Sequence, residues 1–198
     1  PMLVAQATAA AGYFLGTPGA FQKENQRIIK SMKQQMGNIV LIGMPGTGKS
    51  LIGKLLAELT GKTLQDTDAK IEEEAKMTIP EIFEKEGETG FRDRESAICK
   101  KLGKERNLII ATGGGAILRP ENVDALRQNG TLVHITRSID KLPTRGRPLS
   151  QNIETLKKME AQRMPLYKAA ADITFRNNYT CSRKKLRQRV NTYILEKL

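Results

Sequence analysis

The sequence predicts an α/β protein built in three layers, in which helices cover both faces of a five-stranded parallel sheet. From Asn38 onward, short apolar runs alternate with helix-like segments, which is the pattern of a parallel sheet covered on both sides. A glycine-rich turn, residues 43–50, stands between the first apolar run and the first helix. The 198 residues are 39% hydrophobic and 27% charged, which is ordinary for one domain with a buried core.

The strands and helices of this domain are expected from residue 38 to the end of the chain. The expected strands are 38–43, 62–66, 107–112, 131–136 and 172–176, and the expected helices are 49–60, 69–76, 79–86, 92–103, 120–129, 152–163 and 182–197. Ligands bind at the carboxyl ends of the strands in such a sheet. The loops after Ile42, Gln65, Ala111 and Thr136 should therefore converge on one site.

The first 36 residues are expected to form a separate helical extension and linker, with the α/β domain over residues 37–198. Residues 2–15 are alanine-rich and helix-like, a break follows at residues 16–19, and residues 22–35 resume helical spacing. The chain begins without a basic, apolar leader, so no secretory signal is expected.

Composition argues against several classes of protein. No apolar run reaches the roughly 18 residues of a membrane span. The cysteines Cys99 and Cys181 lack metal-ligand spacing, so we expect free thiols in a cytoplasmic protein. His134 stands in an apolar run and is interpreted as structural. The net charge of +12 suggests nucleic acid, but the chain has no Trp and no aromatic-rich basic strand for base stacking. We therefore expect neither a nucleic-acid partner nor a membrane partner.

Residues 43–50 read Gly-Met-Pro-Gly-Thr-Gly-Lys-Ser, the pattern of a Walker A phosphate-binding loop. Its glycines let backbone N–H groups point at phosphate oxygens, and the following helix adds its positive N-terminal end. Lys49 can reach the terminal phosphates, and the Ser50 hydroxyl can ligate Mg²⁺. The expected ATP-binding residues of the loop are Gly46, Thr47, Gly48, Lys49, Ser50 and Leu51. A glycine-rich turn around a buried lysine is the alternative.

Asp66-Thr67-Asp68 ends the second expected strand. On an extended segment, carboxylates at positions i and i+2 point the same way. One of them can support Mg²⁺ while the other holds a substrate hydroxyl. A helix N-cap at Asp68 explains the same residues equally well.

Arg92, after Phe91, can bind a carboxylate through two parallel N–H···O hydrogen bonds, and Glu95 can lock the arginine through an i,i+3 pair. An ordinary charged helix start is the alternative. Gly113-Gly114-Gly115 follows the third strand, and three consecutive glycines suggest a close backbone approach to a ligand rather than a plain turn.

Two later segments bring further positive charge. Arg145 and Arg147 flank Gly146 in the loop after the fourth strand, which is typical of a mobile lid that brings charge to a transferring phosphoryl group. Arg163, expected at the end of a helix, is available as a second anion anchor.

In this order, the motifs of residues 38–198 resemble those of shikimate kinase. The resemblance implies a P-loop kinase fold and ATP-dependent phosphorylation of the 3-hydroxyl of shikimate, with Mg²⁺ as the cofactor. It assigns catalysis to Lys49, Asp68 and Arg147, the metal to Ser50 and Asp66, and shikimate to Asp68, Phe91, Arg92, Gly114, Gly115 and Arg163. Arg147 would also contact ATP.

The resemblance also implies a site for the adenine ring. Residues 137–149 are shorter than the corresponding loop of many relatives, which carry an additional arginine against the adenine, and Arg145 can substitute for it. Adenine is also expected near Asn177 and Asn178.

Residues 1–16 resemble the last helix of shikimate dehydrogenase, with Met2 and Gln6 at substrate-contacting positions. The two resemblances together suggest the kinase half of a dehydrogenase–kinase fusion, and a chance alanine-rich helix is the alternative. For the kinase domain, the rivals are a gluconate-type or nucleotide kinase of the same architecture and a nucleic-acid-dependent P-loop ATPase.

Overall fold

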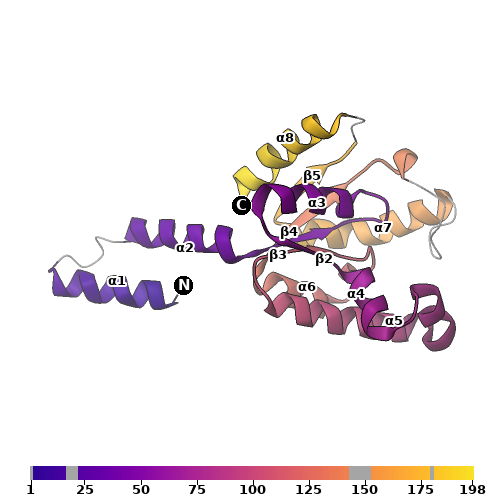
Figure 1. Ribbon diagram of the computed structural model, residues 1–198, viewed down its shortest axis with the longest axis horizontal. Helices are drawn as coiled ribbons and strands as arrows, with labels where there is room; N and C mark the ends of the chain where they lie inside the picture. Colours follow the sequence, from indigo (N-terminus) through magenta and orange to yellow (C-terminus); the bar gives the residue numbers. More distant parts are fainter. Residues whose placement is uncertain (1, 17–21, 143–152, 179–180) are drawn as a thin grey trace. The chain divides into compact units, whose positions relative to one another are not determined.

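A computed structural model describes residues 2–16, 22–142, 153–178 and 181–198 of the chain (Figure 1). These residues belong to two compact units, Pro1–Gly37 and Asn38–Leu198. Within the described ranges, no helix combines the length and the hydropathy that a bilayer crossing requires.

The second unit contains one parallel sheet of five strands in the order β2-β3-β1-β4-β5. The strands are β1 (Asn38–Ile42), β2 (Thr63–Asp66), β3 (Leu108–Ala111), β4 (Gly130–Thr136) and β5 (Ile173–Arg176). Every residue of β1 is buried, because β3 and β4 pair with its two edges and hydrophobic clusters cover its two faces. The chain leaves β3, crosses over β1 and enters β4, so the loop after β1 lies where ligands bind in such sheets.

Helices cover both faces of the sheet, and alternate residues of β1 show how (Figure 1). Ile39 and Leu41 belong to the hydrophobic cluster on the side of α3 (Lys49–Thr60) and α8 (Arg183–Tyr193). Val40 and Ile42 belong to the cluster on the opposite side, because successive side chains of a strand point to opposite faces. The helices of that side are α4 (Thr67–Ala75), α5 (Ile79–Lys104), α6 (Pro120–Arg127) and α7 (Ile153–Ala170). The predicted three-layer fold is confirmed.

Several helix predictions were wrong in their limits. The helices expected at 79–86 and 92–103 form one element, α5, with a non-helical residue only at Gly87 (φ 68°, ψ −173°). The helix expected to end at residue 163 continues as α7 through Pro165 to Ala170. Tyr167 and Ala170 of this last turn are buried in the core, and tertiary packing of this kind outweighs the local preference against proline.

Short 3₁₀ turns connect the larger elements at Ala116–Leu118, Ile139–Lys141 and Leu195–Lys197. The last of them replaces the end of the helix expected at 182–197, since α8 stops at Tyr193.

The first unit consists of α1 (Met2–Phe14) and α2 (Gln22–Met36). Both helices lie within one residue of their predicted limits. The Thr8 hydroxyl donates to the Val4 carbonyl inside α1 (2.9 Å), and Gly12 is the buried residue of this helix.

Candidate active site

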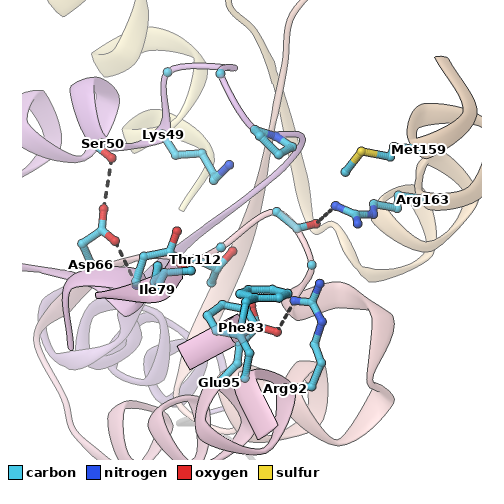
Figure 2. Close-up of a pocket in the computed structure, with 18 of the residues that line it drawn as sticks. Lys49, Ser50, Asp66, Ile79, Phe83, Arg92, Glu95, Thr112, Met159 and Arg163 are labelled. Carbon is cyan, nitrogen blue, oxygen red and sulfur yellow. Dashed lines mark hydrogen bonds and ion pairs between the residues drawn. The ribbon is translucent and has the colours of Figure 1, made fainter. Parts of the chain in front are cut away.

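A cavity of about 610 Å³ opens at the carboxyl ends of β1, β2 and β3 (Figure 2). Its described lining comes from the glycine-rich loop after β1, the start of α4, two turns of α5, the loop after β3, and α7. Three of the four loops predicted to converge do so. The described lining includes no residue of the loop after Thr136.

The loop after β1 is shaped for an anion. Gly46 and Gly48 have positive φ angles of 85° and 96°, which glycine adopts without strain. Gly48 directly precedes α3, and no side chain caps the first turn of this helix among the described residues. The first N–H groups of α3 are therefore left to a ligand. The buried Lys49 ammonium donates to the carbonyls of Gly43 (2.7 Å) and Met44 (3.0 Å).

Ser50 and Asp66 meet at one edge of the cavity, where the Ser50 hydroxyl donates to Asp66 Oδ2 (3.1 Å; Figure 2). Asp66 Oδ1 accepts the backbone N–H of Asp68 (3.1 Å), which makes Asp66 the N-cap of α4. The prediction of an extended pair at 66 and 68 was therefore wrong, and so was the alternative of a cap at Asp68. The Asp66 side chain captures the N–H two residues on and turns the chain into the helix.

The Asp68 carboxyl lines the same cavity from the first turn of α4. Its Oδ1 is buried and has no hydrogen-bond partner among the described residues. Burial, followed by the nearby carboxylates of Asp66 and Glu95, raises the pKa of Asp68 to about 6. A carboxyl with this pKa can exchange a proton near neutral pH.

Arg92 forms the predicted i,i+3 pair with Glu95 (2.7 Å) and a further ion pair with Glu88 (3.2 Å). Glu95 is fully buried, and burial raises its pKa although Arg92 opposes the shift. The Arg92 guanidinium also lies 5.2 Å from the centre of the Phe91 ring, which stacks on Phe83 at 4.8 Å. The arginine is thus held by its own protein while it lines the cavity.

The loop after β3 is fixed from three sides. The Gly113 N–H donates to the Thr67 hydroxyl (2.9 Å). The Gly114 carbonyl accepts from Arg163 Nη1 (3.0 Å) and from the Tyr167 hydroxyl (2.6 Å).

The second and third glycines of this loop leave no room for a side chain. A Cβ at Gly114 would lie 2.6 Å from Pro45 of the phosphate-binding loop, and a Cβ at Gly115 would overlap the Arg92 guanidinium. The glycines therefore permit the close approach of an arginine and of the neighbouring loop.

Arg163 lies inside α7, not at the end of a helix as predicted. Burial lowers its pKa. Arg92 from α5 and Arg163 from α7 both line the cavity (Figure 2), so the structure brings together the two predicted carboxylate ligands.

The remaining predicted residues divide into three groups. Leu51 and Phe91 line the cavity. Thr47 is buried, and its carbonyl accepts a hydrogen bond from the side-chain amide of Asn177 (2.8 Å). Asn177 is not part of the cavity lining. Asn178 donates to Ser138 (2.6 Å). Arg145 and Arg147 lie outside the described residues.

The structure adds cavity residues that the sequence reasoning missed, namely Ile79, Pro80, Phe83 and Met159. Helical spacing carries the signal for one of them. Met159 precedes Arg163 by four residues, so the two share a face of α7. Gly87 breaks the helical geometry between Phe83 and Phe91.

Two further predictions concern single residues away from the cavity lining. His134 is buried and stacks on Tyr167, which agrees with a structural histidine. Cys99 and Cys181 are free.

Comparison with known proteins identifies the family. The family model described as shikimate kinase matches residues 45–198. The chain belongs to the shikimate kinase family. It is 47% identical over 145 residues to the shikimate kinase of Nitrosomonas europaea, covering 69% of this chain and 69% of that protein. It is 40% identical over 151 residues to the shikimate kinase of Chromobacterium violaceum, covering 72% and 82%.

Solved structures agree with this assignment. The chain is similar to shikimate kinase from Acinetobacter baumannii in complex with shikimate, with 35% identity and a TM-score of 0.75 over 84% of this chain and 97% of that chain. It is also similar to shikimate kinase from Aquifex aeolicus, with 30% identity and a TM-score of 0.66 over 78% and 94%. The predicted family and the predicted kinase activity are confirmed.

Proposed function

We propose that this chain transfers the γ-phosphoryl group of ATP to the 3-hydroxyl of shikimate. The observation that carries the proposal is a single cavity with phosphate-binding groups in one wall and two arginines in another. The uncapped N-terminus of α3 and Lys49 suit a triphosphate. Arg92 and Arg163 suit a small carboxylate.

The nucleotide is assigned to the phosphate-binding loop. The N–H groups of residues 46–51 would hold the β- and γ-phosphates, and Lys49 would move from the Gly43 and Met44 carbonyls toward the phosphate oxygens. The Lys49 ammonium already lies against two carbonyls of the loop, so this step requires movement of its side chain only.

Ser50 and Asp66 would hold Mg²⁺. Their hydroxyl and carboxylate oxygens are the hard ligands that this ion takes, and they already lie 3.1 Å apart. Among the described residues no cluster of three His, Cys, Asp or Glu side chains is suited to a metal, so phosphate oxygens and water would complete the coordination. When bound, the ion neutralises negative charge on the phosphates.

Shikimate is assigned to the wall formed by α5, α7 and the loop after β3. Arg92 and Arg163 would bind its carboxylate, and Gly114 and Gly115, which line the same cavity, would contact the ring through their backbone. Phe91 would form an apolar side of the ring pocket. The Asp68 carboxylate would orient the attacking hydroxyl and accept its proton, because its raised pKa matches that task near neutral pH.

Arg147 is proposed to contact the transferring phosphoryl group, and Arg145 is the alternative residue for a charge contact from the same segment. Both arginines follow β4, whose end lies beside the phosphate-binding loop. An arginine placed there would neutralise charge that develops on the phosphoryl oxygens.

The function is tested by ADP release from MgATP with a panel of acceptors. Shikimate should give turnover, while gluconate and nucleoside monophosphates should give none above the ATPase background. Turnover with gluconate or a nucleotide, and none with shikimate, would contradict the proposal. ATPase activity that DNA or RNA stimulates and that salt suppresses steeply would favour the nucleic-acid-dependent alternative.

Replacing Arg163 by alanine should raise the KM for shikimate on the order of 10²-fold, because charge-assisted hydrogen bonds to a carboxylate are lost. The effect on kcat should be smaller, since the carboxylate does not react. Arg127→Ala is the matched control, because Arg127 bonds the Ala170 carbonyl and Asp172 rather than any cavity residue. An unchanged KM for shikimate in Arg163→Ala would rule out this carboxylate contact.

Arg92→Ala should raise the same KM but gives a less clean test. Its removal leaves the Glu95 carboxylate fully buried without its cation, which costs roughly 3–5 kcal/mol of folding free energy. The thermal unfolding temperature of this variant should therefore be measured together with its kinetics.

A fused dehydrogenase remains a proposal that rests on the likeness of residues 1–16 alone. The first unit forms two helices, and no dinucleotide-binding motif occurs in its sequence. We expect the parent reading frame to encode shikimate dehydrogenase upstream of Pro1, and an unrelated upstream sequence would contradict the fusion.

A further inference from the structure

Tyr167 has no role in the proposed reaction, although its side chain contacts the wall of the cavity. It lies on α7 four residues after Arg163, and only 1% of its surface is exposed. It does not line the cavity. Its hydroxyl nevertheless reaches the loop after β3 and donates to the Gly114 carbonyl at 2.6 Å. A buried tyrosine is expected to find a partner for its hydroxyl, but this partner belongs to the cavity wall.

The ring of Tyr167 is held from behind. His134 of β4 stacks on it with ring centres 4.8 Å apart and an angle of 20° between the planes. Burial lowers the pKa of His134 to about 4 and raises the pKa of Tyr167. At neutral pH both rings are therefore uncharged, and the phenol remains a hydrogen-bond donor.

The Gly114 carbonyl connects Tyr167 to Arg163, because it accepts from both side chains. One residue on, Gly115 lies against the Arg92 guanidinium, and Gly114 itself lies against Pro45 of the phosphate-binding loop. A shift of Gly114 would therefore displace Arg163, and through Gly115 it would change the space left for Arg92. The phenol hydroxyl fixes this carbonyl from outside the cavity.

We propose that Tyr167 is a positioning residue of the acceptor site, which acts by aligning the Gly114 carbonyl and the Arg163 guanidinium. The inference rests on the proposed function, since it takes these groups to bind the carboxylic acid acceptor. It predicts a larger effect on the acceptor than on the nucleotide, because the Gly114 carbonyl bonds Arg163 directly but meets the phosphate-binding loop only through Pro45. The nucleotide contacts arise from the loop after β1, where Lys49 and Ser50 have partners of their own.

The test is Tyr167→Phe, which fills the same space and keeps the stacking on His134. The variant lacks the hydroxyl that donates to the Gly114 carbonyl. This loss should raise the KM for shikimate about tenfold, the size expected for one net hydrogen bond. The KM for ATP should stay within about twofold, because this end of the cavity keeps its contacts. Steady-state kinetics with each substrate varied in turn measure the difference.

Val190→Ala is the control for a general loss of stability. Val190 is fully buried in the cluster on the other side of the sheet, so its truncation weakens the core without touching the glycine loop. Thermal unfolding of both variants shows whether their losses of stability are comparable. The control should retain both KM values.

Three results decide the inference. A tenfold rise confined to the shikimate KM of Tyr167→Phe supports it. An unchanged shikimate KM, or an equal rise in both KM values or in both variants, overturns it in favour of a purely structural tyrosine. Absence of shikimate turnover in the unaltered protein would instead contradict the proposed function.

Discussion

Replacing Lys49 by methionine should reduce phosphoryl transfer from ATP to shikimate by about 10³-fold or more. Loss of a single preorganised donor at a charged transition state costs about 10²–10³ in rate, and loss of a cationic phosphate ligand costs up to about 10⁵. Lys49 is the cation of the phosphate-binding loop, and its ammonium is already buried against the loop carbonyls. Methionine retains the length and most of the packing of the side chain but not its charge.

Lys54→Met provides the matched control for this prediction. Lys54 is exposed on the same helix, α3, and does not line the cavity. Turnover of this variant in the coupled ADP-release assay should equal that of the unaltered protein. Full turnover of Lys49→Met, with a normal unfolding temperature, would contradict the assignment of Lys49 as a ligand of the ATP phosphates.

The sequence predicted the phosphate-binding loop because its chemistry is local. Glycines at 46 and 48, a lysine and a hydroxyl follow one another between a strand and a helix, and the backbone conformation they require depends on few distant contacts. The alternation of apolar runs with helical segments likewise predicted the parallel sheet. The strand order was not predicted, because the pairing of β1 with β3 and β4 depends on contacts between segments far apart in the chain.

Predictions failed where distant packing or a side-chain bond overrides local preference. Pro165 suggested a helix end, but the core contacts of Tyr167 keep α7 helical beyond it. Asp66 ends β2 as predicted, but its bond to the Asp68 N–H also makes it the cap of α4, and this bond places Asp68 in a helix rather than on the strand. The role inferred for Tyr167 has no local signal either, since its partner, Gly114, lies more than fifty residues away.

The same cavity concentrates groups that are unfavourable for folding. Asp68 Oδ1, Glu95 Oε1 and the Nε atoms of both cavity arginines are buried without a hydrogen-bond partner among the described residues. Such atoms cost free energy in the folded state unless a ligand satisfies them. Without its ligand, the protein is therefore expected to be less stable than a variant in which a charged cavity side chain is replaced by a neutral one.

Asp68→Asn tests this relation and should separate stability from activity. The folded-state pKa of Asp68 is raised from 3.8 to about 6, so the folded protein holds this proton more tightly than the unfolded chain does. Ionisation of Asp68 therefore destabilises the fold progressively as the pH rises from about 4 to 6, and the full penalty persists above that range. Asparagine stays neutral and avoids it.

Without ATP and Mg²⁺, the Asp68→Asn protein should accordingly unfold at a higher temperature than the unaltered protein at pH 8. The pKa difference corresponds to at most about 3 kcal/mol, or up to roughly 10 °C for a chain of this size. This difference in unfolding temperature should shrink as the pH approaches 5, because Asp68 of the unaltered protein then also takes up a proton. Thermal unfolding by circular dichroism across this pH range measures both effects.

The same substitution should lower kcat at least about 10²-fold, because an amide cannot accept the proton of the attacking hydroxyl. Asp124→Asn is the matched control, since Asp124 is exposed on α6 and away from the cavity. It should alter neither turnover nor the pH dependence of unfolding. Near-normal turnover in Asp68→Asn would reject the proton-accepting role. A lower unfolding temperature at pH 8 would show that the ionised carboxylate is stabilised in the fold, contrary to its buried and unpartnered position.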